Sequence, residues 1–178
     1  MNILSLDLSL TSTGYCHNGE TGVISVDKTG PHRLWLIKRK VEDLIIEFSI
    51  DVVAMEGYSF ASRNSQAHSI GELGGVIRLL LWELGRPVVV IPPTCRAKFA
   101  TGKGNASKNE VISSVSAKTG LVWSNPGADD KCDAWIMEEM VLARLGSPRF
   151  DWPATHVSGL EKVDWTLLNA YIKQLGEK

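Results

Sequence analysis

Four carboxylates in this sequence stand at places where acidic side chains could perform metal-ion chemistry. Asp7 interrupts an otherwise apolar run near the N-terminus, and Glu56 ends a second apolar run. Asp130 and Asp133 lie three residues apart in one charged cluster. An ionised carboxylate in a dry interior is costly unless it is paired or coordinates a metal, so the position of Asp7 needs a reason beyond packing. A metal ligand at the centre of a sheet is one such reason.

Each of these acids also has an ordinary structural explanation. Asp7 could lie at the end of its strand and cap the Ser/Thr-rich turn that follows, and the strand alone leaves both explanations open. Asp130 and Asp133 would share one face in the first turn of a helix, where the helix dipole favours anions. Acids at such positions are ordinary helix-start residues, so this cluster taken alone indicates capping more often than catalysis.

The segments around these acids predict an α/β domain with a mixed sheet. The apolar run 3–8 suits a strand buried on both faces. Residues 13–18 and 22–26 predict two short strands joined through an Asn-Gly dipeptide, so the chain begins as an antiparallel meander. Apolar residues at helical spacing follow Pro31 and predict a helix that covers one face of the sheet.

The next segments continue the sheet with parallel strands. Residues 52–55 predict a strand that ends at Glu56, and the apolar run 88–91 matches a central parallel strand. Between them, residues 66–84 predict a long helix with three internal glycines, each of which costs about 1 kcal/mol relative to alanine. This cost suggests close approach of another backbone, either the sheet or a twin helix across a dimer axis.

A basic region follows the last predicted strand. Residues 96–118 carry five basic side chains against one acid, although the whole chain of 178 residues has a net charge of −1. A short helix capped by Thr94 and a helix over 107–118 flank a glycine-rich loop, where backbone amides and two lysines could bind phosphate. A solvated loop is the more frequent meaning of such a sequence, and the spacing of a Walker A loop is missing. The basic residues are Arg96, Lys98, Lys103, Lys108 and Lys118.

The length and composition limit the classes of protein to which this chain can belong. The length fits one domain, which we place at 1–146, followed by an appendage over 147–178 whose final helix, 164–175, packs on the core. Three cysteines in no paired spacing support neither a disulfide framework nor a zinc knuckle, and they favour a reducing cytosol. We find no apolar run of membrane-spanning length and no secretory signal pattern.

Taken together, the four acids predict a metal-dependent reaction. The meander, the strand that ends at Glu56 and the late helix that begins near Asp130 would bring four carboxylates to one edge of the sheet. Two divalent ions about 3.5–4 Å apart need such an oxygen cluster, and carboxylates select Mg²⁺ or Mn²⁺. The predicted reaction is in-line hydrolysis of a phosphodiester by metal-activated water.

Several short motifs follow one another in a specific order. They are Asp7-Leu8-Ser9 with Thr11 to Gly14, Glu56 with Asn64, Leu73-Gly74-Gly75-Val76, Pro92-Pro93-Thr94 with Lys98, Thr101-Gly102-Lys103-Gly104 with Ala106 and Lys108, and Asn125-Pro126 before Asp130-Lys131-Cys132-Asp133-Ala134. No single motif is specific, but in this order they resemble the RuvC family of Holliday junction resolvases. That family lies within the ribonuclease H-like superfamily, and the resemblance covers roughly residues 1–145.

The resemblance implies a structure-selective DNA endonuclease with two Mg²⁺ ions per site, for which Mn²⁺ could substitute. The implied ligands are Asp7, Glu56, Asp130 and Asp133. It also implies a homodimer, formed through the helix 66–84, that cuts symmetrically placed strands of a four-way junction and leaves 5′-phosphate and 3′-hydroxyl ends. Such an enzyme would act without a nucleotide cofactor in the cytoplasm of a bacterium or a phage-infected host.

The same resemblance implies which side chains contact DNA. The implied contacts to the backbone are Lys103, Lys108, Lys98 and Arg63. Tyr58 or Phe60 could stack on unpaired bases at the crossover. Core packing is the equally supported alternative for these two aromatic side chains.

The sequence departs from the family pattern near its last acids. The run 125–133 is one residue longer than in cellular members, so Asp129 competes with Asp130 for the third ligand position. We prefer Asp130, because its spacing to Asp133 matches the family. The near-neutral charge and the tail after Ser147 favour a divergent, phage-type member that could cut several branched DNAs.

Two other classes of protein compete with this interpretation. An ATP-binding fold of the sugar kinase and actin type also begins with an acidic hairpin, but it needs two such domains, which 178 residues do not provide. A non-catalytic DNA-binding relative would keep the fold without the chemistry. The presence of all four carboxylates argues against it.

Overall fold

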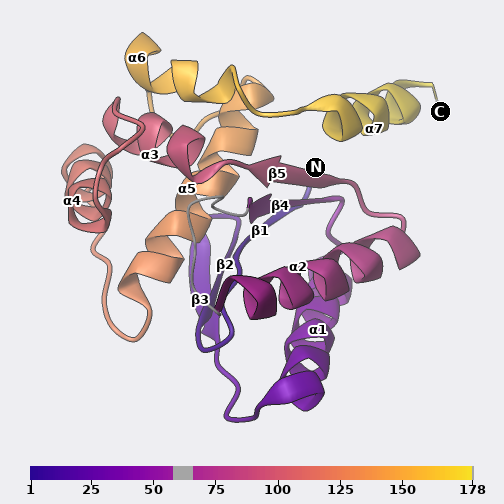
Figure 1. Cartoon of the computed structure of the whole chain (residues 1–178). Helices are drawn as coiled ribbons and strands as arrows, with labels where there is room; N and C mark the ends of the chain where they lie inside the picture. The colour runs from indigo at the N-terminus through magenta and orange to yellow at the C-terminus, as the bar shows by residue number, and fades with distance from the viewer. Residues whose placement is uncertain (58–65, 178) are drawn as a thin grey trace.

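A central five-stranded mixed sheet organises the molecule. The computed structural model describes residues 1–57 and 66–177. The strands are β1 (Ile3–Asp7), β2 (Thr13–His17), β3 (Glu20–Ile24), β4 (Val52–Glu56) and β5 (Val88–Ile91). They lie in the order β3-β2-β1-β4-β5, with β1 antiparallel to β2 and parallel to β4 (Figure 1). This topology confirms the predicted sheet, in which parallel strands follow an antiparallel meander.

The hairpin between β2 and β3 differs by two residues from the prediction. The third strand was predicted over 22–26, but β3 begins at Glu20. Asn18 and Gly19 have positive φ angles of 52° and 83°, as a two-residue type I′ turn requires. Such a turn returns the chain at once, so His17 pairs with Glu20 and the strand begins there.

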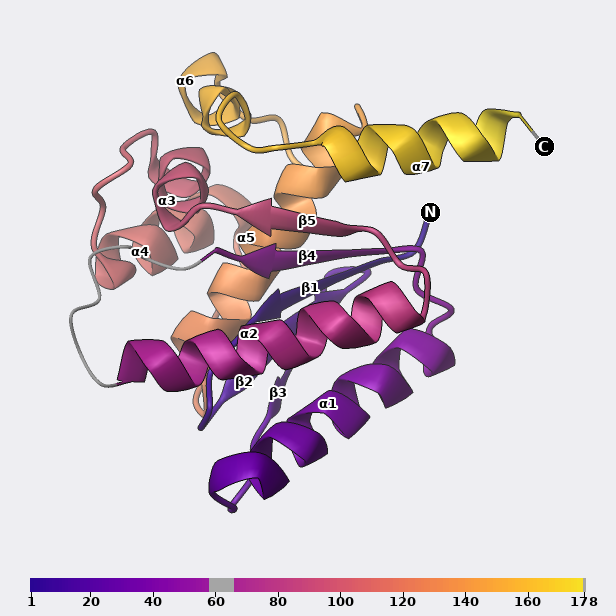
Figure 2. The ribbon, with the colours of Figure 1, turned by 45° about the vertical axis from the view of Figure 1, so that its right-hand side comes forward.

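Helices cover both faces of the sheet. They are α1 (Gly30–Glu47), α2 (Gln66–Glu83), α3 (Pro93–Thr101), α4 (Lys108–Thr119), α5 (Ala128–Arg144), α6 (Ala154–Val157), the 3₁₀ helix η1 (Ser158–Leu160) and α7 (Thr166–Gly176). α1 and α2 lie together on one face and α5 crosses the other (Figures 1 and 2). Because successive strand residues point to opposite faces, Leu4 and Leu6 pack under α1 and α2, whereas Ile3 and Ser5 face α5. Asp7 therefore belongs to the α5 face.

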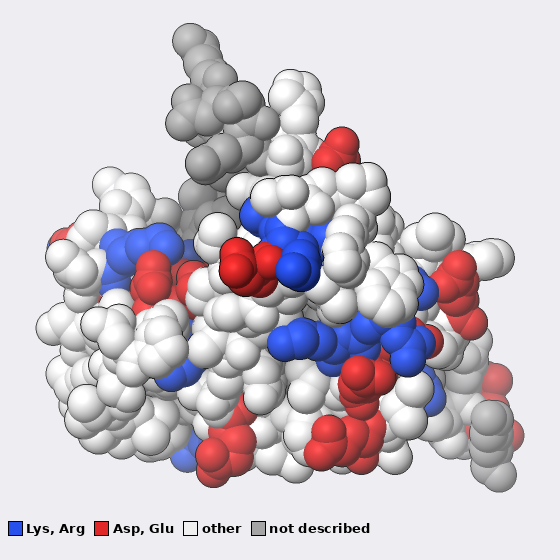
Figure 3. Space-filling view, turned by 90° about the horizontal axis from the view of Figure 1, so that it is seen from below, with Lys and Arg blue, Asp and Glu red and all other residues white. Residues whose placement is uncertain are grey.

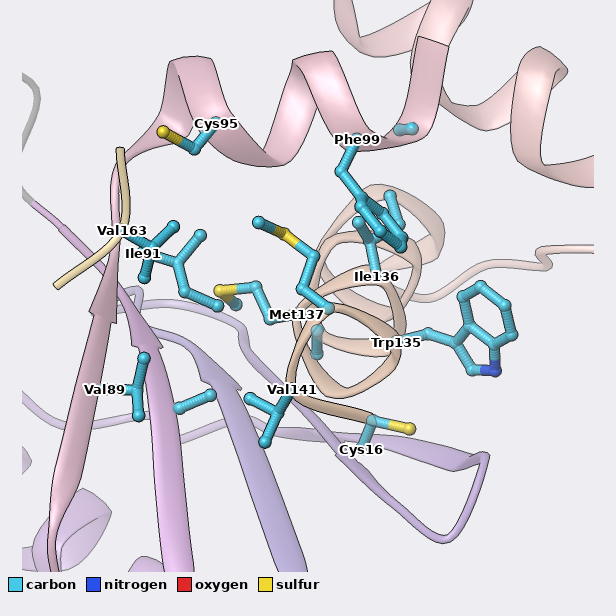
Figure 4. Packing of buried hydrophobic residues seen from close by; sticks show 14 of the residues in the cluster. Cys16, Val89, Ile91, Cys95, Phe99, Trp135, Ile136, Met137, Val141 and Val163 are labelled. Atoms are coloured by element: carbon cyan, nitrogen blue, oxygen red, sulfur yellow. The ribbon is translucent and has the colours of Figure 1, made fainter. Parts of the chain in front are cut away.

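The hydrophobic core on the α5 face fixes α5 to the sheet. Figure 4 shows side chains of α5, such as Met137 and Val141, packed beside Val89 and Ile91 of β5. Trp135, one of three tryptophans in this buried cluster, is only 1% exposed. The beginning of α5, which carries the acids, is thus held by the packing of its middle.

The two short helices after β5 begin where their first residues dictate. α3 begins at Pro93 and is not capped by Thr94, because proline has a preset φ and its missing N–H is not needed at a helix start. α4 begins with a capping box in which Ser107 accepts a hydrogen bond from the amide of Glu110 and the Glu110 side chain accepts one from the Ser107 amide. The predicted helix over 107–118 is confirmed to within one residue at each end.

The segment after residue 146 contains more regular structure than predicted. In this segment only the helix 164–175 was predicted, but residues 154–160 also form α6 and η1, which lie against α3. α7 lies beside the edge strand β5 (Figure 2). Trp152 and Leu168 belong to the same buried cluster as the core side chains of α5. Among the described helices, none has the length and apolar character needed to cross a membrane.

Two buried carboxylates of α5 hold the start of this C-terminal segment. Glu138 and Glu139 are 1% and 0% exposed, and acids so deeply buried need partners. The Arg149 guanidinium lies 2.7 Å from a Glu138 oxygen and 3.2 Å from a Glu139 oxygen, and Trp152 Nε1 donates to Glu139 at 3.1 Å. The sequence alone does not predict this network, because its members become neighbours only when the chain turns back after α5.

Candidate active site

Asp7 and Glu56 end two neighbouring parallel strands. Leu6 of β1 pairs with Met55 of β4, so the residues that follow, Asp7 and Glu56, leave the sheet side by side at one edge. Asp7 is 8% exposed, and the Glu56 side chain is 21% exposed. Two acids far apart in sequence thus become neighbours through the register of one strand pair.

The first turn of α5 brings Asp130 to the same edge. Gly14 of β2 pairs with Asp7, and a β-carbon added to Gly14 would lie 2.2 Å from the carbonyl oxygen of Asp130. Only glycine lets the helix lie directly on the strand at this place. The Ser5 hydroxyl donates to the carbonyl oxygen of Ala134 at 2.6 Å, which holds the next turn of α5 against β1.

An arginine from α3 joins Asp133 to Glu56. Arg96 Nε donates to Glu56 Oε1 at 2.7 Å, and Arg96 Nη1 donates to Asp133 Oδ1. The side chains of Arg96 and Asp133 are 10% and 5% exposed. The sequence placed Arg96 only among the basic residues of the region 96–118, with no part in the carboxylate site. Its position one helical turn after an apolar strand, between Cys95 and Ala97, both buried, is the signal that could have identified it.

Burial and crowding with like charges raise the pKa of two of the acids, Asp7 and Asp133. Burial raises the pKa of Asp7 well above its ordinary value of 3.8, and the charges of Glu56 and Asp133 raise it further against the opposing charge of Arg96. Burial also raises the pKa of Asp133 to about 7, although Arg96 opposes the shift. One guanidinium therefore does not neutralise the cluster, and a bound divalent cation would reduce the remaining excess of negative charge.

The donor set fits a divalent cation of the magnesium type. Carboxylates offer only oxygen atoms, which Mg²⁺ and Mn²⁺ prefer, and the crowded charge attracts a cation. In residues 1–57 and 66–177, no three acidic, histidine or cysteine side chains already converge on one point that could hold an ion. Arg96 bonds one oxygen of Glu56 and one of Asp133, so the second oxygen of each carboxylate is the one left to face an ion.

Asp129 and Asp130 have different surroundings although they are adjacent. Lys108 Nζ donates to Asp129 Oδ2 at 2.6 Å, and this hydrogen bond lowers the pKa of Asp129. Asp130 instead adds to the negative charge that raises the pKa of Asp7. Burial lowers the pKa of Lys108, but the hydrogen bond to Asp129 and the charges of Asp129, Asp133 and Asp7 outweigh it, so the pKa is raised overall. Lys108 is thus within electrostatic reach of the carboxylate cluster.

The remaining residues proposed to contact DNA fall into two groups. Lys103 is exposed in the loop between α3 and α4, and Lys98 is half-buried on α3. Tyr58, Phe60 and Arg63 lie outside the described residues. On the face that Figure 3 shows, basic and acidic side chains lie interspersed, in keeping with the near-neutral charge of the chain.

Known proteins with similar sequences are DNA-cleaving enzymes. A sequence model described as crossover junction endodeoxyribonuclease RuvC matches residues 6–137. The chain belongs to the RuvC family. RuvC from Synechococcus sp. (strain WH7803) is 30% identical over 145 residues, which span 75% of this chain and 93% of that relative. RuvC from Chlorobium chlorochromatii (strain CaD3) is 32% identical over 133 residues, which span 68% of this chain and 69% of that relative.

Solved RuvC structures share the fold. The Thermus thermophilus RuvC structure has a TM-score of 0.65 at 23% identity and covers 83% of this chain and 98% of its own. The same RuvC in complex with a Holliday junction substrate has a TM-score of 0.63 at 24% identity, with 83% and 97% covered. The fold is ribonuclease H-like, as the sequence predicted, and the predicted enzyme class, a hydrolase that acts on DNA, is confirmed by the RuvC family.

Proposed function

We propose that this protein is a metal-dependent endonuclease that resolves Holliday junctions by paired, symmetric phosphodiester hydrolysis. The observation that supports the proposal is that Asp7, Glu56, Asp130 and Asp133 lie near one another at the carboxyl ends of β1 and β4, in a chain of the RuvC family. Its relatives are named crossover junction endodeoxyribonucleases, and a RuvC with the same fold has been solved with a Holliday junction. The products would carry 5′-phosphate and 3′-hydroxyl ends.

The residues at this edge would have two roles, metal binding and DNA contact. The four acids would hold Mg²⁺ or Mn²⁺, two ions about 3.5–4 Å apart, which supply the Lewis acidity that phosphodiester hydrolysis needs. Asp7 and Glu56 are fixed by the sheet, and the acids of α5 are fixed by the helix packing on β2. Lys108, which is within electrostatic reach of the cluster, and the exposed Lys103 would contact the DNA phosphates.

A second copy of the chain would supply the second active site. Gly75, Leu79 and Trp82 share one face of α2, because they are four and three residues apart. Leu79 and Trp82 are 55% and 80% exposed, and a β-carbon on Gly75 would meet nothing within 4 Å. A small residue beside large exposed apolar side chains suits a helix that pairs with its own copy. We therefore infer a homodimer through α2, and Trp82→Glu should shift it to monomer in light scattering.

The proposed location is the cytoplasm. Cys16, Cys95 and Cys132 are all buried and free. Free thiols suit the reducing compartment that their spacing predicted. They support this location as part of the proposal.

The test is cleavage of a labelled four-way junction beside linear duplex, flap and replication-fork DNA. Each substrate is incubated with Mg²⁺, with Mn²⁺ and with a chelator. We expect paired, symmetric nicks confined to the junction and no cleavage with the chelator. Asp7→Asn should bind the junction as well as wild type and cut none of it, because the substitution removes a charge but little volume.

The alternatives give different results in this assay. Metal-dependent cutting of all branched forms would indicate a broader debranching nuclease with the same acids. Junction binding without cutting under any condition would indicate a non-catalytic relative. Cleavage by Asp7→Asn at the wild-type rate would remove Asp7 from the mechanism.

A further inference from the structure

Arg96 is a buried cation within the cluster of proposed metal ligands. The residue is 8% exposed, and its guanidinium bonds both Glu56 and Asp133. Asp7 also lies close enough for its charge to act on Arg96. One arginine thus interacts with three of the four acids, although nothing in the proposed reaction assigns it a role.

The backbone that carries Arg96 is held from two sides. α3 begins directly after β5, whose last residue, Ile91, pairs with Glu56. On the other side η1 packs on the α3 backbone, since a β-carbon added to Gly159 would lie 2.8 Å from the carbonyl oxygen of Cys95. The guanidinium therefore reaches the acids from a fixed support.

The guanidinium donates a hydrogen bond to one oxygen of each carboxylate. Nε bonds Oε1 of Glu56 at 2.7 Å, and Nη1 bonds Oδ1 of Asp133. A carboxylate has a second oxygen with its own lone pairs, so each acid can still offer an oxygen to an ion. Two donors in one rigid plane also fix the separation of the two acids, which the single flexible ammonium of a lysine does not do.

The positive charge of Arg96 acts against a second cation in the same place. Repulsion between like charges is stronger in a partly dry site than in water. Removal of this charge would make the cluster more negative and strengthen its attraction for a divalent ion. It would also release Glu56 and Asp133 from their fixed separation, so affinity for the ion and turnover should change in opposite directions.

We propose that Arg96 is a positioning residue that holds Glu56 and Asp133 at the separation required for cleavage and lowers the affinity of the site for divalent cations. The inference rests on the metal site proposed above. If Arg96 only stabilised the fold, its substitution would change neither the affinity for the ion nor the turnover at saturating ion.

The experiment measures Mn²⁺ binding to the full chain without DNA, by electron paramagnetic resonance, for wild type, Arg96→Gln and Arg96→Lys. Glutamine keeps hydrogen-bond donors without the charge, and lysine keeps the charge without the planar fork. We expect Arg96→Gln to bind Mn²⁺ about tenfold more tightly and Arg96→Lys to stay within about threefold of wild type. Both should lose about 10- to 100-fold in kcat for junction cleavage at saturating Mn²⁺, because the acids are misplaced.

A matched control removes a positive charge elsewhere. Lys118 lies over the Trp152 ring, 5.6 Å from its centroid, so Lys118→Gln should bind Mn²⁺ with wild-type affinity.

Mn²⁺ affinities of Arg96→Gln and wild type that agree within twofold would overturn the inference and leave the metal site standing. No Mn²⁺ binding by wild type would refute the metal site itself. If circular dichroism shows that Arg96→Gln does not fold, Arg96→Lys decides: reduced kcat with unchanged Mn²⁺ affinity supports the inference, and wild-type kcat overturns it.

Discussion

Gly14 and Asp130 lie in direct backbone contact, because a β-carbon added to Gly14 would lie 2.2 Å from the Asp130 carbonyl oxygen. Gly14 also pairs with Asp7 in the antiparallel register of β1 and β2. The contact therefore sets how closely the acids of α5 approach the acid of β1. The geometry of the site depends at this point on a residue without a side chain.

Gly14→Ala should displace the first turn of α5 and remove most cleavage activity. The atoms that the new methyl group meets include backbone of Asp130, which cannot rotate away, so we expect a loss of about 1–3 kcal/mol in the free energy of unfolding. Urea unfolding and junction cleavage measure the two effects. Gly176→Ala is the matched control, because its β-carbon would meet nothing within 4 Å, and it should change neither. Full activity of Gly14→Ala would show that the close contact is unnecessary.

Asp129→Asn and Asp130→Asn should differ sharply in cleavage of a four-way junction. Asp130→Asn should abolish it, because Asp130 acts on Asp7 within the cluster. Asp129→Asn weakens only the ion pair between Asp129 and Lys108, whose side chains are 41% and 64% exposed. Because an exposed ion pair contributes little, the substitution should lower the free energy of unfolding by at most about 1 kcal/mol and leave cleavage largely intact. The reverse order would identify Asp129 as the third ligand.

Stability of the metal-free protein should depend on pH through Asp133. Its pKa is about 7 in the folded protein against an ordinary 3.8, so the folded state binds the proton more tightly than the unfolded state. The stabilisation from this proton is complete below about pH 4 and is lost as the pH rises to about 7. Relative to wild type, Asp133→Asn should therefore gain stability over this interval in urea unfolding with chelator. Parallel pH profiles of the two proteins would contradict the raised pKa.

Lys108→Ala should weaken binding to junction, fork and flap DNA by a similar factor. A phosphate contact carries no sequence or shape information, and its loss should reduce the slope of log affinity against log salt by about 1. Fluorescence anisotropy at several salt concentrations measures both. Lys173 on α7, 80% exposed and 3.8 Å from Glu177, offers the control variant Lys173→Ala, which should bind normally. An unchanged slope for Lys108→Ala would argue against a phosphate contact.

The sequence determined most of the elements of this protein, because their signals are local. The Asn-Gly dipeptide predicted the hairpin, and the helix predicted over 107–118 corresponds to α4. Continuous apolar runs predicted buried strands, and parallel strands that end in acids predicted that Asp7 and Glu56 share one edge. Over 154–160, which follows Pro153 and contains Gly159, the same local signals missed short helices that tertiary contacts stabilise.

Only the tertiary structure decided which charges meet. Arg96 reaches Glu56 and Asp133, which lie 40 and 37 residues away in sequence, and Lys108 reaches Asp129 across 21 residues. Sequence patterns counted both cations alike as parts of a basic region, yet one is buried among the acids and the other is exposed. The reason is physical: periodicity encodes which face of an element is apolar, whereas the partner of a long charged side chain depends on how whole elements pack against one another.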